Sequence, residues 1–179
     1  MAQVRIQRLQ IADAPRSIIC YDLSMKKIII ILGIFIALGV AYWLISPLFI
    51  TVRVSEGVEE IMKMAAPDSS EQAEPEVVAT GTFEGLKGHR ASGTAKLLKI
   101  GEKYFIRLDD DFYVTNGPDL FVHLGRDGVY AAEARLASLK GNEGSQNYEV
   151  PEGVDVSKYN EVWIWCRAFS VEFGKAILE

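Results

Sequence analysis

The sequence predicts an all-β domain, an antiparallel β-sandwich, preceded by a single transmembrane α-helix and a flexible tether. Three observations carry this prediction: an uncharged apolar run (28–52), an acidic stretch with prolines after it, and a C-terminal part punctuated by glycines. About 20 apolar residues are enough to cross a bilayer core. Short β-rich runs between frequent turn signals are typical of sandwiches and barrels.

The chain therefore divides into four segments. They are a cytoplasmic leader (1–27), a transmembrane helix (28–52), a juxtamembrane stalk and linker (53–79) and a β-sandwich domain (80–179). Met25 begins the segment MKKIIIILG, which has the layout of a complete signal-anchor. An over-extended start before Met25 is therefore an alternative reading of the leader.

The apolar run is interpreted as an uncleaved signal-anchor rather than a cleaved signal peptide. A cleaved signal has an apolar region of about 7–15 residues before a cut site with small residues. Gly39 and Ala41 could mimic such a site, but the apolar stretch continues past them. Tyr42 and Trp43 are expected near one membrane interface, where amphipathic rings are favoured.

The distribution of charge predicts the orientation and excludes one class of partner. Residues 1–27 carry five basic and two acidic groups, whereas residues 51–79 carry two and seven. The positive-inside rule therefore predicts a single-pass protein of the cell membrane, with a cytoplasmic N-terminus and an extracytoplasmic C-terminal domain. Residues 80–179 carry twelve basic and fifteen acidic groups with no basic cluster, which argues against nucleic-acid binding.

The segment after the span contains a short helical pattern and then a polar stretch. Residues 53–66 place apolar side chains at helical spacing, with Glu59 and Lys63 four residues apart. We expect a loosely helical stalk ended by Pro67. An oligomer-forming stripe is the alternative, although the run is too short for a convincing coiled coil. Residues 67–79 are acidic and contain proline, which predicts a flexible tether.

The last hundred residues show the pattern of a β domain. Twelve glycines separate the runs GTFEG, ASGTAKLLKI, KYFIRL, FYVT, DLFVHL, NYEV, EVWIWC and FSVEF, which are the predicted strands. Turn chemistry lies at 117–119, 126–128 and 151–153. One stretch resists this reading: residues 130–141 contain helix formers, and an irregular crossover is the alternative there.

The two cysteines lie on opposite sides of the apolar run. Cys20 precedes it and Cys166 follows it, so the predicted topology prevents them from pairing within one chain. Cys166 would then be an odd thiol in a space that permits disulfides. It is the candidate for redox catalysis.

Strand alternation in EVWIWCR separates the thiol from its aromatic neighbours. Cys166 falls on one face, and Trp163 and Trp165 fall on the other. Cys166 is either a small core hydrophobe or a partly exposed thiolate, with Arg167 beside it lowering its pKa. Trp163 and Trp165 are either an aromatic binding face or a packing contact between two layers.

Histidine and aspartate offer weaker candidates for a metal site. His89, in KGHRASG, or His123, in FVHLG, could bind a metal or haem iron, but no ligand spacing supports this, and the cofactor stays unknown. The run Asp109–Asp111 could bind calcium, but it lacks the D-x-[DN]-x-[DN]-G pattern and is read as a solvated turn. No hydrolase motif is present, which favours a module that is not a stand-alone enzyme.

The last hundred residues resemble a known family. The segments GTFEGLKGHRASGTAKL, NGPDLFVHLG and LKGNEGSQNYEVPEGVDVSKYNEVWIWCRAFSVEFGKAIL are similar to the DM-thirteen domain, the electron-transfer DM module of Skeletor-type proteins. The resemblance runs from Gly81 to about Leu178. It implies a compact β-sandwich, and it implies that Cys166, in the motif W-C-x-x-F, is the redox-active residue. His89 corresponds to the family's histidine before the S-G pair.

Three functions follow as hypotheses. The first is a membrane-tethered module for electron transfer or thiol redox chemistry, with Cys166 as its thiol and with His89 either poising it or helping to hold an unidentified metal. The second is a non-catalytic adhesion or interaction module in which Cys166 is structural. The third is a metal or haem carrier using His89 or His123. Besides the membrane, the expected partner is a redox protein or a cell-surface protein.

Overall fold

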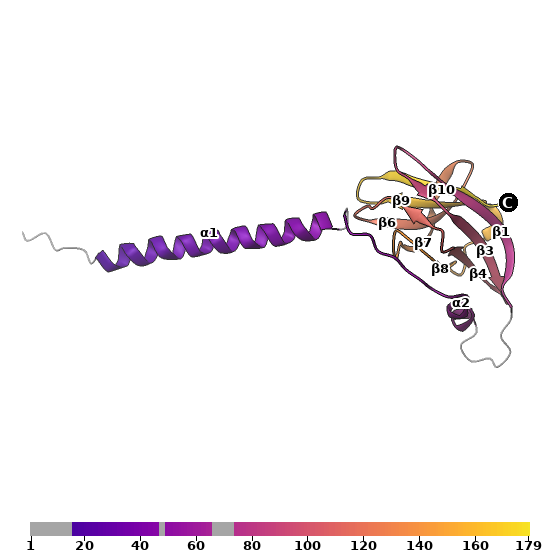
Figure 1. Cartoon of the computed structure of the whole chain (residues 1–179), viewed down its shortest axis with the longest axis horizontal. Helices are drawn as coiled ribbons and strands as arrows, with labels where there is room; N and C mark the ends of the chain where they lie inside the picture. The colour runs from indigo at the N-terminus through magenta and orange to yellow at the C-terminus, as the bar shows by residue number, and fades with distance from the viewer. Residues whose placement is uncertain (1–15, 47–48, 66–73) are drawn as a thin grey trace, which may run out of the picture. The chain divides into compact units, whose positions relative to one another are not determined.

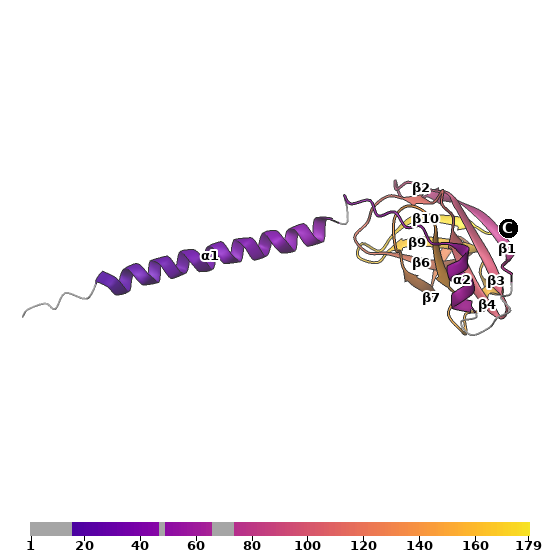
Figure 2. The same ribbon diagram turned by 60° about the horizontal axis from the view of Figure 1, so that its bottom comes forward.

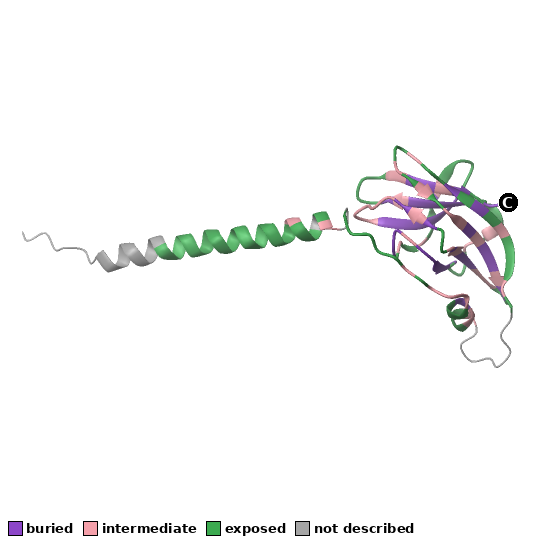
Figure 3. Ribbon diagram, in the orientation of Figure 1, coloured by how far each residue is buried: buried purple, intermediate pink, exposed green. Residues whose placement is uncertain are grey.

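The apolar N-terminal run is a long helix in the computed structural model of the protein, which describes residues 16–46, 49–65 and 74–179 (Figure 1). Helix α1 (Arg16–Ile45) contains the segment Ser24–Trp43, which is long and apolar enough to cross a membrane. Its apolar side chains are exposed along that segment (Figure 3). The helix is therefore a candidate membrane span or signal sequence.

Helix α1 has other limits than the predicted span of 28–52. It ends at Ile45, ahead of Pro47 in the sequence, and proline disfavours helix both at its own position and at the preceding residue. Residues 1–15 of the predicted leader, 47–48 of the predicted span and 66–73 of the predicted stalk and linker lie outside the described part of the chain.

The chain divides into two units, Met1–Trp43 and Leu44–Glu179. The second unit contains a short helix, α2 (Val58–Ala65), and a short 3-10 helix, η2 (Val156–Lys158). Its strands are β1 (Glu76–Gly85), β2 (Ala91–Ser92), β3 (Thr94–Ile100), β4 (Lys103–Leu108), β5 (Tyr113–Val114), β6 (Leu120–Arg126), β7 (Val129–Ser138), β8 (Gln146–Glu149), β9 (Glu161–Cys166) and β10 (Val171–Ile177). The predicted all-β domain is confirmed.

Eight strands form one antiparallel sheet in the order β7-β6-β9-β10-β1-β3-β4-β8, and β2 pairs with β5 beside it. The two edge strands, β7 and β8, approach each other. The sheet is therefore nearly closed on itself, around a core that it encloses (Figure 1).

The stretch that resisted a strand assignment is largely strand β7. The β6–β7 hairpin turns on Asp127 and Gly128, whose φ angles of 55° and 78° suit a two-residue type I′ turn. This turn joins Arg126 to its register partner Val129. The helix formers of residues 130–141 are overridden because pairing with β6 satisfies the backbone of β7.

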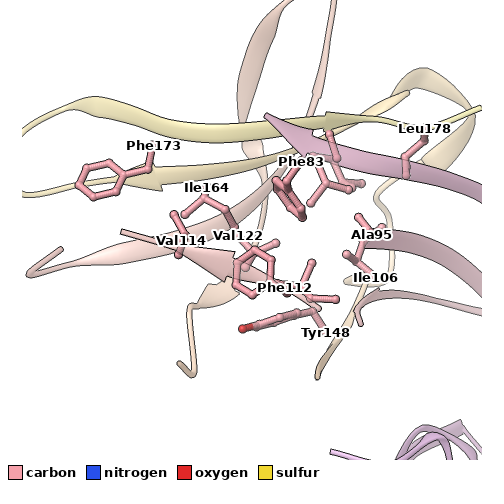
Figure 4. Packing of buried hydrophobic residues seen from close by; sticks show 14 of the residues in the cluster. Phe83, Ala95, Ile106, Phe112, Val114, Val122, Tyr148, Ile164, Phe173 and Leu178 are labelled. Atoms are coloured by element: carbon pink, nitrogen blue, oxygen red, sulfur yellow. The ribbon is translucent and has the colours of Figure 1, made fainter. Parts of the chain in front are cut away.

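The core lies between the inner faces of the curved sheet. Phe83 and Phe112 meet edge to face at 5.1 Å between ring centroids, a favourable aromatic geometry. Around them pack buried aliphatic and aromatic side chains, including Ala95, Leu97, Ile106, Val114, Val122, Tyr148, Ile164, Phe173 and Leu178 (Figure 4).

Helix α2 covers the outside of the sheet. It lies over β3 and β4 (Figure 2). Its Ile61 is fully buried against Leu98, Ile100 and Phe105, which form a second apolar cluster on these strands. The predicted juxtamembrane helix therefore packs on the β domain and covers an apolar patch on the sheet.

Residues 52–57, which we call the strap, bind the loop that precedes β8. The Val52 amide donates to Asn142 Oδ1 at 2.7 Å, and the Val54 amide donates to the Glu143 carbonyl at 2.9 Å. Side-chain and backbone contacts thus fix the strap along its length.

Glu56 is the centre of the strap. Its carboxylate accepts hydrogen bonds from Lys140 Nζ at 2.6 Å and from the Asn147 amide at 2.7 Å. Its carbonyl accepts from Arg107 Nη1 at 3.2 Å and from Ser145 Oγ at 2.9 Å. Charge-assisted hydrogen bonds are stronger than neutral ones, so Glu56 ties the strap to three separate strands and loops.

Replacing Ile61 by alanine should lower the free energy of unfolding by about 2–3 kcal/mol, because a fully buried aliphatic side chain is lost. The measurement is urea unfolding of the full chain in detergent, followed by tryptophan fluorescence. Glu60→Ala on the exposed side of α2 is the matched control and should change stability by less than about 0.5 kcal/mol. Equal effects of the two variants would show that α2 does not pack on the sheet.

Candidate functional site

Strand β9 carries the candidate residues, and its neighbours fix its two faces. It is paired with β6 on one side and with β10 on the other. Ile164 and Cys166 belong to the buried cluster, whereas Trp163 and Trp165 lie outside it. The alternation read from EVWIWCR therefore holds in the structure.

Cys166 is completely buried, with an exposed fraction of 0%. Its register partners are Leu120 on β6 and Val171 on β10, so its surroundings are mainly apolar. The chain then turns through the exposed residues Arg167–Ser170, and Ser170 has a φ of 51°, an uncommon conformation for a residue other than glycine.

A cavity of about 370 Å³ has a lining that does not include Cys166. It is lined by Ile50, Val52, residues 116–120 and residues 138–142. Leu120 lines the cavity and directly opposes Cys166, and opposed residues on paired strands have Cβ atoms about 4.5–5.5 Å apart. Leu120 is therefore a lining residue of the cavity that lies beside Cys166 in the sheet.

His89 is half-buried and stacks on Phe173, with 3.6 Å between ring centroids and 10° between the planes. Its amide donates to the Leu86 carbonyl at 2.9 Å. Within the described part of the chain, no hydrogen bond or ring contact joins His89 to Cys166. The structure thus ties His89 to a core aromatic ring.

His123 is buried on β6, with 5% of its surface exposed. Its Nδ1 lies 3.2 Å from the Ala131 carbonyl oxygen, so the neutral ring carries its proton on Nδ1 and donates it to that oxygen. Burial lowers the pKa of His123 below its usual range, and the positive charge of Arg135 lowers it further, although the bond to Ala131 opposes both.

The candidate metal ligands are dispersed. Among the residues that the structure describes, no group of three or more His, Cys, Asp or Glu side chains could hold a metal ion. A metal bound by His89 or His123 would therefore need ligands from elsewhere. In the acidic run, Asp109 pairs with Lys96 at 2.6 Å and Asp110 with Arg53 at 2.9 Å.

Five aromatic side chains form a continuous group on the outer side of β6, β7 and β9, which we call the aromatic face. Its members are Phe121, His123, Tyr130, Trp163 and Trp165. Tyr130 stacks on Trp165 at 4.0 Å between centroids, and it meets His123 edge to face at 5.2 Å. Tyr130 and Trp165 are half-exposed, whereas the other three are buried.

Trp163 is the least exposed member of this face and is held in place by its neighbours. Its indole Nε1 donates to Glu161 Oε2 at 2.9 Å, and Lys175 Nζ lies 5.6 Å from the centroid of its ring. A Cβ at Gly125 would collide with the indole, so the absence of a side chain at Gly125 gives the ring its place on β6. Of the two tryptophans predicted as a binding face, only Trp165 is open to a partner.

Tyr130 is the member of the aromatic face that the sequence did not reveal, and Arg135, whose guanidinium lies over the ring of Phe121, was not predicted either. Both lie in the stretch whose helix formers obscured strand β7. The alternation of Phe121 with His123 is visible in the sequence. Contacts between β7 and β9 are not, because these strands lie on either side of β6 in the sheet and their contacts leave no local signal.

Comparison with known proteins supplies one match. A family model described as electron transfer DM13 matches residues 82–178, which covers most of the β domain. No curated protein and no solved structure matches the chain.

The lowered pKa of His123 predicts that the free energy of unfolding decreases as pH falls below about 6.5, the value for an unperturbed histidine. In that range the unfolded chain takes up a proton that the buried ring resists, so stability rises with pH. Unfolding curves measured between neutral and mildly acidic pH check this. His123→Gln should flatten the dependence, and His89→Gln controls for the loss of a histidine. An unchanged slope in His123→Gln would contradict the assignment.

Proposed function

The chain belongs to the electron transfer DM13 family, and from this premise we propose that it is a membrane-anchored module that takes part in electron transfer with a separate redox protein. The family match over residues 82–178 is the observation that carries the proposal.

We propose that helix α1 anchors this module. The segment Ser24–Trp43 is apolar enough to span a bilayer, and Lys26 and Lys27 lie at its N-terminal end. An excess of basic residues marks the cytoplasmic side of a span. This charge pattern supports an extracytoplasmic β domain, in a space where a reactive thiol would meet oxidants.

Cys166 is the redox candidate that the family suggests, and its burial limits how it could act. Only a thiolate reacts as a nucleophile, and a reactant must touch the sulfur. The resting structure offers no such contact. Thiol chemistry would therefore pass through a locally opened state, either by displacement of Leu120 from the cavity side or by opening of the turn at Arg167–Ser170.

A second candidate function is favoured by the same burial. A cysteine with no exposed surface and with apolar neighbours behaves as a small hydrophobic core residue. In that case the domain is an adhesion or interaction module, and Cys166 contributes packing alone. The two functions differ in one measurable quantity, the rate at which Cys166 opens to reagents without unfolding of the domain.

Alkylation of the native full chain by iodoacetamide measures this rate, in a Cys20→Ser background that leaves Cys166 as the single thiol. Under the redox proposal, Cys166 reacts much faster than the domain unfolds. Leu120→Ala should then raise its labelling rate by about tenfold, since local openings need less free energy than global unfolding.

Leu124→Ala is the matched control, because Leu124 lies on the same strand and is buried in the same core but does not line the cavity. Rates are compared after correction for the measured stability of each variant. Labelling that follows global unfolding in all three proteins would reject the thiol route and leave the interaction module.

A further inference from the structure

The aromatic face lies over the strand that carries Cys166. Trp165 and Arg167, the residues on either side of the cysteine, have their side chains on this outer surface, whereas Cys166 points inward. Any protein that docks here would contact the same strand, one residue away from the buried sulfur.

Cationic side chains overlie the aromatic rings. The guanidinium of Arg167 lies 4.7 Å from the centroid of Phe121, and that of Arg135 lies 5.2 Å from it. Such positions are typical of cation–π contacts. Both arginines are exposed, although Arg167 donates from Nε and Nη2 to the carboxylate of Asp119.

The charge on this surface contrasts with that of the domain. Residues 80–179 carry more acidic than basic groups, yet Arg126, Arg135 and Arg167 are all exposed on β6, β7 and the turn after β9. Arg167 is paired with Asp119 at 2.7 Å. Within the described part of the chain, Arg135 has no carboxylate partner, so its guanidinium can donate hydrogen bonds to a carboxylate of another protein.

Besides Asp119, two carboxylates near this surface are already engaged. Glu161 is buried and accepts from Trp163 and from the Gly128 amide. Glu133 lies 3.9 Å from Arg126. Over Phe121, the unpaired charge that remains is the positive charge of Arg135, whereas the exposed Asp127 lines a pocket with Tyr130 near the β6–β7 turn.

We propose that the aromatic face, with Arg135 and Arg167, is the docking surface for an acidic patch on the electron-transfer partner. Trp, Tyr and Arg are the residues that dominate binding energy at interfaces. Electron-transfer encounters use small interfaces, and complementary charge gives them speed and orientation. The inference rests on the proposed function, and it names the chemistry of the partner's surface.

The test uses the full chain in phosphatidylcholine nanodiscs and a short oligo-glutamate peptide as the acidic probe. Binding is followed by tryptophan fluorescence at rising salt. The face predicts weak, salt-sensitive binding even though the domain is acidic overall. Arg135→Glu should weaken it by about tenfold, because a charge that meets the probe is reversed.

Two further variants distinguish binding at the aromatic face from a nonspecific effect of the protein's charge. Tyr130→Ala removes the ring that stacks on Trp165 and should also weaken binding, with circular dichroism confirming an intact fold. Lys63→Glu makes the same charge reversal on α2, which packs over β3 and β4, and should have less than about a twofold effect.

Absence of binding to the wild-type chain, or equal weakening by Lys63→Glu and Arg135→Glu, would overturn the proposal. The alkylation of Cys166 does not depend on the aromatic face. A failure of peptide binding would therefore leave the electron-transfer proposal untouched. Slow alkylation of Cys166 would leave the aromatic face as the contact surface of an interaction module.

Discussion

The alternation of strand β9 is the constraint on which the site depends. Because β9 is paired with β6 and β10 along both edges, it cannot rotate, and successive side chains must point to opposite faces. Cys166 is thereby placed in the core, and Trp165 is placed outside. A shift of one residue would exchange the two sets. The inaccessible thiol and the aromatic face are consequences of the same register.

The strap and α2 extend the folded domain beyond the residues that match the family. They precede residues 82–178, yet Glu56 and Ile61 are tied to the sheet by hydrogen bonds and by burial. Without them, the apolar cluster around Phe105 would face solvent, and large exposed apolar patches promote association. The structure thus assigns the segment after α1 a part in the stability of the β domain.

The strands, the turn at Asp127 and the two faces of β9 could be predicted from the sequence, because alternation and turn chemistry are local signals. Strand β7 could not, because its helix formers mask a pairing that only β6 imposes. The packing of Ile61 and the stacking of Tyr130 on Trp165 join residues far apart in the chain. The burial of Cys166 was one of two alternatives left by the sequence. Strand alternation shows on which side of the sheet a residue lies, but it does not show what packs against that side.

The aromatic face bears on both candidate functions of the domain. An interaction module could use this exposed surface of rings and arginines as it stands, because a partner can contact it without any local opening of the domain. For thiol chemistry the same contact must reach Cys166, and Arg167 is the first residue of the turn whose opening would uncover it. A partner that drew Arg167 away from Asp119 would act directly on that turn. The ion pair between Arg167 and Asp119 is therefore the element through which docking and access to the sulfur would be coupled.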